Sequence, residues 1–335
     1  MVLENIRACP CFPSIFIALS AALLDFAVGD PPYIIHPVQV MGWFIVWYRK
    51  WVWKSIPSPQ GQRLAGVVLG IGLPLISGAL AAGMVILAGK IHTSCEMTTA
   101  IVLIASSLAA RSLRRAAEEV MEPLSRGDLS MARTTLSMYV SRDTDKLTKA
   151  EILRAVMETI SENATDGVTS PLFYALLGLS ISPAFGVAFA FAYKALSTLD
   201  SMVGYLNPPY RHLGWWSARS EDWATWLPCR LTVFTICILS GEPMRVWSIC
   251  SRDAPADPSP NAGWSECVYV AALGVQVGGL NIYKGISKRK PHLGDALRPI
   301  SYGVINEGLQ LTRWTIWVWL TIWCLLQYAF GCKGE

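Results

Sequence analysis

The stretch LAGVVLGIGLPLISGALAAGMVILAG, residues 64–89, runs for 26 positions without a charged side chain. The hydrocarbon core of a bilayer is crossed by about 20 apolar residues in a helix, so this stretch is long enough to span a membrane. It predicts a transmembrane helix and, with it, an integral membrane protein.

The composition agrees with this class. Of 335 residues, 53% are hydrophobic, 16% are charged and 14 are Trp, whereas a typical soluble domain has about 25% charged residues. These values exclude disordered, collagen-like and coiled-coil chains and leave too little polar surface for an ordinary soluble enzyme. We therefore expect an all-α polytopic membrane protein, a helical transmembrane bundle forming a single integral membrane domain over residues 1–335. The net charge of +4 is too small to indicate a nucleic-acid partner.

Other apolar segments add to the predicted bundle. Three of them complete a set of four expected spans: residues 98–110, 171–193 and the Trp-rich 312–331. Three weaker candidates are 13–24, 226–240 and the short, Gly-rich 267–280. We interpret the first of these as an uncleaved helix, because it continues into Asp25 and Asp30 rather than into a small-residue cleavage site.

Basic residues are concentrated in three loops, 30–63, 111–170 and 241–312, while the turn at 90–97 holds only Lys90. The positive-inside rule places the three basic loops in the cytoplasm and the turn outside. We expect 111–170 to be a cytoplasmic helical loop with an acidic motif, and 241–312 to be a cytoplasmic Pro-rich motif loop.

The acidic motif lies on a predicted helix. Thr148 and Glu151 form a capping-box pattern, so the helix is expected from about 149 to 164. Glu158, Glu162 and Asp166 then follow at i, i+4 and i+8, on one helix face. Like charges at this spacing destabilise a helix by about 0.2–0.5 kcal/mol per pair, so a cation such as Mg²⁺, or arginines from another loop, is expected to offset them. A solvated acidic face is the alternative.

Two further polar segments border apolar ones. Lys194 and Asp200 follow the segment 171–193, where the lysine is either functional or extends to the membrane interface. The loop 252–266 contains three prolines that hold its charged residues in place, although a stiff connector explains them equally well. No P-loop, dinucleotide-binding or serine-nucleophile motif occurs.

Together these blocks resemble the adenosylcobinamide-phosphate synthase family of cobalamin biosynthesis, known as CobD/CbiB. The resemblance is carried by Leu24-Asp25, Gly29-Asp30-Pro31, His36-Pro37-Val38, Met41-Gly42, Ser141-Arg142-Asp143-Thr144, Glu158 to Asn163, Asp166-Gly167, Thr198 to Tyr205, Arg252-Asp253, Pro258 to Glu266 and Gly294-Asp295. The chain departs from the family pattern at Ser197, Glu221, Thr225 and Asp257.

The resemblance implies an ATP-dependent acid–amine ligase. It would join adenosylcobyric acid to (R)-1-aminopropan-2-ol or its O-phosphate, giving adenosylcobinamide or its phosphate. ATP would be a co-substrate used with Mg²⁺, and no tightly bound cofactor is expected. The resemblance also implies a multi-pass protein of the inner (cytoplasmic) membrane, with its active site facing the cytoplasm. The implied partners are the lipid bilayer and other late cobalamin-pathway membrane enzymes.

Such a reaction needs carboxylates for proton transfer and Mg²⁺, and cations for phosphate. The expected catalytic carboxylates are Asp143, Glu158, Glu162, Asp166, Asp200, Asp222 and Asp253, with Glu158, Glu162 and Asp166 as the Mg²⁺ ligands. The expected substrate contacts are His36, Arg142, Lys146, Asn163, Lys194, Arg230, Arg252, Asn261 and Glu266. The sequence leaves open which carboxylate acts as a base and which binds metal.

Two other functions remain open at this stage. A membrane transporter would place its ionisable residues inside the spans, whereas most of those here lie in loops. A non-catalytic sensory relative linked to β-lactamase induction would have lost the acidic blocks. If 171–193 crossed the membrane once, Asp200 and Asp222 would lie outside the cell. We therefore expect a re-entrant or broken helical pair, interrupted at Ser182-Pro183.

Overall fold

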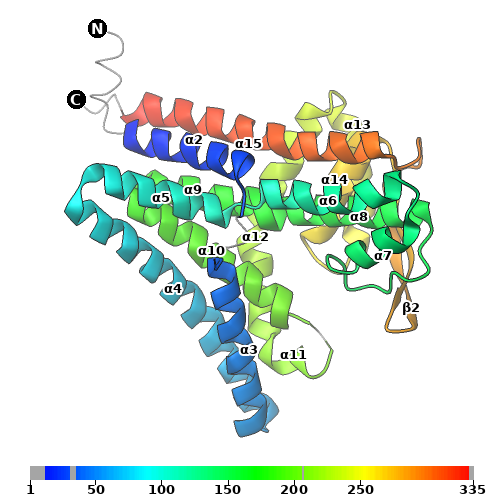
Figure 1. Ribbon diagram of the computed structural model, residues 1–335, viewed down its shortest axis with the longest axis horizontal. Coiled ribbons are helices and arrows are strands. Elements are labelled where there is room, and N and C mark those ends of the chain that lie inside the picture. Colours follow the sequence, from blue (N-terminus) through cyan, green and yellow to red (C-terminus); the bar gives the residue numbers. More distant parts are fainter. Residues whose placement is uncertain (1–11, 31–34, 206, 332–335) are drawn as a thin grey trace. The chain divides into compact units, whose positions relative to one another are not determined.

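The structure is a computed structural model that describes residues 12–30, 35–205 and 207–331, and it is mostly helical (Figure 1). The chain divides into two compact units. The first unit comprises residues 1–109, 170–225 and 319–335, and the second comprises 110–169 and 226–318. The predicted motif loops 111–170 and 241–312 fall almost wholly within the second unit.

The first unit is built from helices. They are α2 (Phe12–Ala27), α3 (Pro37–Ser55), α4 (Pro59–Ile91), α5 (Thr93–Ser107), α9 (Ser170–Leu179), α10 (Pro183–Val203) and the short α11 (Tyr210–Leu213), joined by the first part of α12 (Trp215–Leu239) and the last part of α15 (Tyr302–Gly331). Helix α10 packs against both α4 and α9. Small residues permit this packing, because a Cβ atom on Gly78 would lie 2.8 Å from the carbonyl oxygen of Ala188.

The predicted break at Ser182-Pro183 is confirmed. Helix α9 ends at Leu179 and α10 begins at Pro183, with the Ser182 hydroxyl accepting a hydrogen bond from the Phe185 N–H at 3.3 Å. The two helices return closely on each other, since a Cβ on Gly178 would lie 2.2 Å from the Phe185 carbonyl oxygen. Residues 171–193 therefore form a helical pair, whose re-entry into a membrane remains a prediction.

Two helical stretches of the described chain are long and apolar enough to cross a bilayer, Pro59–Ile91 and Thr93–Ser125. The first contains the 26-residue apolar stretch, and the second contains the predicted span 98–110. Phe12–Ala27 is a shorter apolar helix. Two other predicted spans give no further stretch of this kind. Residues 171–193 are divided between α9 and α10, and residues 312–331 form the Trp-rich end of α15.

The second unit contains the acidic motif. Its elements are α6 (Ala110–Ser125), α7 (Leu129–Leu136), α8 (Lys149–Ala164), a π-helical turn (Thr165–Thr169), the last part of α12, α13 (Pro243–Asp253), a 3₁₀ turn (Ala254–Ala256), α14 (Ala262–Leu273), strands β1 (Val277–Tyr283) and β2 (Ile286–Leu293), and the first part of α15. The predicted helix 149–164 is confirmed with its capping box: Glu151 accepts from the Thr148 N–H at 2.8 Å.

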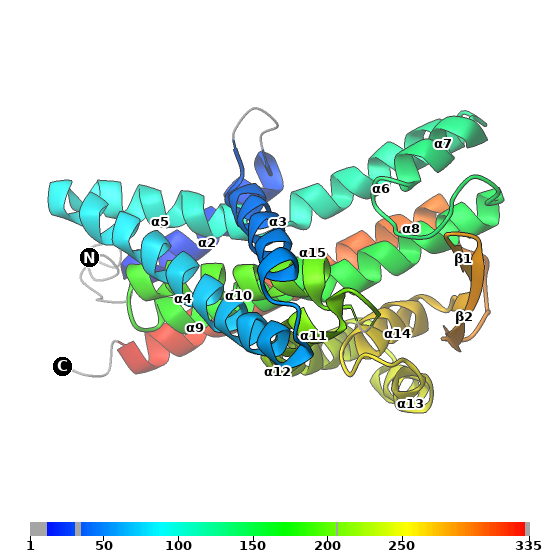
Figure 2. The same ribbon diagram turned by 90° about the horizontal axis from the view of Figure 1, so that it is seen from below.

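The hairpin of β1 and β2 corrects the all-α prediction and the weak span at 267–280. Helix α14 ends at Leu273, and the chain then forms two antiparallel strands. The strands are joined through Lys284 and Gly285, both with positive φ (50° and 77°), as a two-residue hairpin turn of this type requires. Strand β1 contacts α8, and β2 contacts α13 and α14 (Figure 2). The hairpin is thus attached to α8, which carries the acidic motif, and to α13 and α14.

Candidate functional site

Both carboxylate oxygens of Glu158 accept hydrogen bonds. It is 1% exposed; its Oε2 accepts a hydrogen bond from Arg142 and its Oε1 accepts one from the Gly278 N–H at 3.0 Å. Arg142 is itself 9% exposed and donates its Nη1 to Asn281 Oδ1 at 2.9 Å. Arg154 Nη2 donates to the same oxygen at 3.2 Å. Glu158 therefore anchors the hairpin to α8, and the Arg142 guanidinium is engaged by protein groups.

Glu162, one turn further along α8, belongs to a second cluster with Glu266 of α14. The Ser265 hydroxyl donates to the Ser161 carbonyl oxygen at 2.7 Å and thereby locks α14 to α8 beside these two carboxyl groups. Lys290 of β2 donates its Nζ to Glu266 Oε1 at 3.2 Å. The cluster thus brings two carboxyl groups and one ammonium together from three elements.

Burial and neighbouring charges shift the pKa values of all three groups in this cluster. Burial raises the pKa of Glu266 to about 8 and also raises the pKa of Glu162, while the charge of Lys290 opposes both shifts. For Lys290, burial favours the neutral amine, but the neighbouring glutamates outweigh it and raise the pKa of the ammonium. A carboxyl group that titrates near neutral pH beside a fixed cation has the properties of a general base.

Asp143 organises the hairpin turn. Its two carboxylate oxygens accept hydrogen bonds from the backbone N–H groups of Lys284, at 2.9 Å, and Gly285, at 2.8 Å. The Asp143 N–H in turn donates to the Ile282 carbonyl oxygen at 2.8 Å. Both oxygens are used by the turn, so the structure supports a positioning role for Asp143.

Arg252 and Asp253 form a network with Asp295. Arg252 donates to Asp253 at 2.7 and 2.8 Å and to Asp295 at 2.8 Å. Asp253 also accepts from the Gly294 N–H at 2.9 Å, and the Arg252 hydrogen bonds hold its pKa below the usual value. The Arg252 side chain is 57% exposed, so it remains accessible to an anionic ligand.

The other predicted residues of the second unit are less connected to these networks. Arg230 donates to the Pro260 carbonyl oxygen at 2.9 Å and stacks over the Trp264 ring, 4.7 Å from its centroid. Asn261 is buried at the start of α14. Asn163 and Lys146 are exposed, and Asn163 donates a hydrogen bond to the Thr159 carbonyl oxygen. Asp166 lies beyond the end of α8, in the π-helical turn, a feature that is frequent at functional sites.

The remaining predicted residues lie in the first unit. His36 caps α3: its Nδ1 accepts from the Val38 N–H, and its Nε2 lies 2.9 Å from the Ser106 carbonyl oxygen and 3.1 Å from Asp30. Pro31 of the family motif lies outside the described residues. His36 is therefore held by protein groups through both ring nitrogens.

Asp200, Asp222 and Lys194 are half-buried, and the two aspartates interact electrostatically with Glu221. Glu221 is 7% exposed and is hydrogen-bonded by Thr225 and Tyr193. From the sequence, Glu221 is identified only as a departure from the family pattern.

Sequence reasoning also missed Lys290 and Asn281. Both residues fall in the predicted loop 241–312, where Lys290 is part of the basic run 288–290 and Asn281 belongs to no motif. A hairpin predicted at Lys284-Gly285 would have placed both residues on paired strands, where the register sets Asn281 opposite Lys288 and Gly279 opposite Lys290.

Within the described residues, no group of three or more His, Cys, Asp or Glu is arranged to hold a metal. Mg²⁺ usually keeps several waters and takes only one or two carboxylates together with substrate phosphates. The Glu162 carboxyl group fits that limited donor set, whereas Glu158 is occupied by Arg142 and Gly278, and Glu266 by Lys290. Magnesium binding at Glu158, Glu162 and Asp166 remains a prediction.

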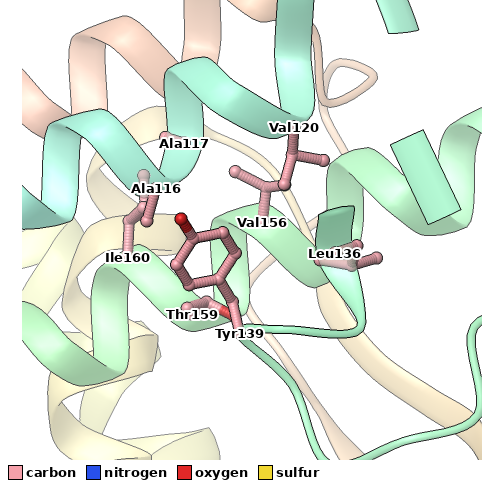
Figure 3. A pocket seen from close by; sticks show the side chains of 8 residues that line it. All are labelled: Ala116, Ala117, Val120, Leu136, Tyr139, Val156, Thr159 and Ile160. Carbon is pink, nitrogen blue, oxygen red and sulfur yellow. The ribbon is translucent and has the colours of Figure 1, made fainter. Parts of the chain in front are cut away.

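A small apolar pocket also lies between α6 and α8 (Figure 3). It is lined by Ala116, Ala117, Val120, Leu136, Tyr139, Val156, Thr159 and Ile160. Tyr139 donates its hydroxyl to Glu119, and burial together with this bond raises the pKa of Tyr139 to about 12. None of the predicted site residues lines this pocket.

Comparison with known proteins identifies the family. Residues 18–312 match the family described as CobD/Cbib protein. The chain belongs to the CobD/CbiB family. It is 48% identical to the cobalamin biosynthesis protein CobD of Synechocystis, over 97% of this chain and 96% of that one. It is 40% identical to CbiB of Salmonella typhi, over 93% and 96%, and 37% identical to CobD of Halalkalibacterium halodurans, over 92% and 95%. No solved structure matches the chain. The resemblance expected for CobD/CbiB from the sequence is thus confirmed.

Proposed function

We propose that this chain is an ATP-dependent ligase of cobalamin biosynthesis. It joins the carboxylate of adenosylcobyric acid to (R)-1-aminopropan-2-ol or its O-phosphate. The observation that carries the proposal is the Glu162–Glu266–Lys290 cluster around the buried Glu266 carboxyl group, in a chain that belongs to the CobD/CbiB family. A carboxyl group of raised pKa is suited to accept the proton of an ammonium group, which this chemistry releases.

The proposed reaction has two steps. The corrinoid carboxylate attacks the γ-phosphorus of ATP, which forms an acyl phosphate and releases ADP. The amine, after loss of a proton from its ammonium form, attacks the acyl carbon, and inorganic phosphate leaves as the amide bond forms. Mg²⁺, when bound, would neutralise charge on the ATP phosphates.

Individual residues are assigned different roles in the proposed reaction. Glu266 accepts the ammonium proton, and Lys290 holds that carboxyl group in place through the 3.2 Å hydrogen bond. Arg252, with its exposed guanidinium, contacts phosphate. We assign Arg142, Glu158 and Asp143 to positioning, because their polar groups bind other parts of the second unit.

The protein is further proposed to be multi-pass in the cytoplasmic membrane, with the site facing the cytoplasm. The two long apolar helical stretches support this location. Labelling of a single cysteine at Ser201, an exposed residue of α10, tests the side on which α10 ends. Modification by a membrane-impermeant reagent added to intact cells would contradict a cytoplasmic position.

The function itself is tested by turnover of the purified full chain in detergent. Adenosylcobyric acid, ATP, Mg²⁺ and the amine, with or without phosphate, are supplied, and products are read by mass spectrometry. We expect an amide product only when ATP is present, and Glu266→Gln should form none. Unchanged corrinoid with both amines would contradict the proposal.

A further inference from the structure

Helix α3 carries an exposed aromatic stripe. Trp43, Trp47 and Trp51 are 60%, 59% and 47% exposed, and Val40 and Phe44 beside them are 51% and 40% exposed. Contiguous exposed apolar surface of this kind marks an interaction site.

The stripe covers one face of the helix. At about 100° per residue, positions 40, 43, 44, 47 and 51 fall within an arc of about 100°. The buried residues of α3, Met41, Ile45 and Val52, fall on another side. The helix therefore packs on the first unit through one face and presents the aromatic face outward.

The charges of α3 are all positive. It contains Arg49, Lys50 and Lys54 and no acidic residue. Arg49 is turned toward the protein, where it donates to the Tyr210 hydroxyl at 3.1 Å. Lys50 and Lys54 are exposed and fall at one edge of the aromatic stripe. Trp flanked by Lys is the composition of a helix that lies in the headgroup region of an anionic membrane.

The direction of α3 fits the same arrangement. Within the first unit, α3 runs crosswise to α5 and obliquely to α4 in both views (Figures 1 and 2). Helix α5 begins one of the two stretches that are long and apolar enough to cross a bilayer. With α5 along the membrane normal, α3 lies along the membrane surface.

We propose that α3 lies in the plane of an anionic membrane surface, with Trp43, Trp47 and Trp51 in the headgroup region and Lys50 and Lys54 on lipid phosphates. The inference rests on the proposed membrane location but not on the ligase reaction. It makes α3 an interfacial element that fixes the depth of the first unit in the bilayer.

Depth measurement separates this arrangement from a spanning helix. Trp43 and Trp51 are eight residues apart, which is about 12 Å along a helix. Nitroxide labels are placed singly at positions 43, 47 and 51 of the full chain. The background retains only the buried Cys229, Cys237, Cys250 and Cys267. Accessibility to oxygen and to a nickel chelate gives the depth of each label in bilayers of phosphatidylethanolamine and phosphatidylglycerol.

We expect the three labels to report the same depth, near the headgroups, and a control label at the exposed Gln39, outside the stripe, to be closer to water. A depth difference of about 12 Å between positions 43 and 51 would show a spanning helix and overturn the proposal. Labels shielded from both lipid and water would show a second copy on this face, which overturns it equally.

Charge provides a second test. In the anionic bilayer, the label at position 47 should lie at a shallower depth in the double variant Lys50→Gln/Lys54→Gln than in the chain that keeps both lysines. The chain that keeps both lysines should show the same change when it is moved to pure phosphatidylcholine. An unchanged depth in both cases would contradict the lysine contacts. Insertion of the full chain is scored separately by extraction with alkaline carbonate, so a failure of membrane location is distinguished from a wrong orientation of α3.

Discussion

Arg142 and Glu158 form a buried ion pair, although sequence reasoning had placed Arg142 on a substrate phosphate and Glu158 on a metal ion. The pair is extended by Gly278 and Asn281 of strand β1. It therefore connects three segments of the second unit: the chain before α8, α8 itself and the hairpin. The two acids of α8 then have separable roles, because Glu158 is fixed by cations while Glu162 lies in the cluster with Glu266 and Lys290.

The first prediction separates these two acids. Glu158→Gln leaves Arg142 buried without its counter-charge, which should lower the free energy of unfolding by about 3 kcal/mol. Glu162→Gln should leave stability within about 0.5 kcal/mol of the parent but abolish turnover. Chemical denaturation and product formation are measured on both variants. Equal loss of stability in the two would contradict the division of roles.

The second prediction concerns the hairpin turn. Asp143→Ala removes both acceptors of the Lys284 and Gly285 N–H groups, so amide hydrogen exchange at 283–286 should accelerate at least tenfold. Asp145→Ala is a matched control, since Asp145 is exposed two residues away. Identical exchange in both variants would show that Asp143 does not hold the turn.

The third prediction uses the capping box. The Thr148 N–H lowers the pKa of Glu151 in the folded chain, so the carboxylate stabilises the fold above the unfolded pKa and this stabilisation is lost as pH falls through the folded pKa. Glu151→Ala should cost about 1 kcal/mol at pH 7, and its difference from the parent should shrink in acid. Glu151→Gln, which keeps a neutral acceptor, should cost less than Glu151→Ala at pH 7, and its difference from the parent should shrink over the same pH range. A cost that stays constant with pH would contradict the linkage.

The fourth prediction concerns Lys290. Its charge lowers the pKa values of Glu162 and Glu266, so Lys290→Met should raise them and move the acidic limb of the kcat profile to higher pH. Lys288→Met on the same strand, where the side chain is exposed, should leave the profile unchanged. An unshifted profile in Lys290→Met would remove Glu266 as the base.

Local signals in the sequence were sufficient for some elements. The Thr148–Glu151 pair fixes the start of α8, and Ser182-Pro183 fixes the break between α9 and α10, because capping and proline act within a few residues. The hairpin was missed because Gly278-Gly279 weakens its strand pattern and Lys-Gly is an unusual turn pair. Gly278 and Asn281, the β1 partners of Glu158 and Arg142, lie more than 100 residues away, and Arg142 precedes α8 outside any helix, so helical periodicity identified an acidic face but not what surrounds it.

The ligase account is tested most directly by the fate of the carboxylate oxygen of adenosylcobyric acid. The corrinoid is labelled with ¹⁸O in that carboxylate and incubated with the full chain, ATP, Mg²⁺ and the amine, and the phosphate released is analysed by mass spectrometry. An acyl phosphate transfers one carboxylate oxygen to inorganic phosphate, so we expect one ¹⁸O in phosphate for each amide formed. Label in AMP, or amide formation with no label in phosphate, would contradict the account.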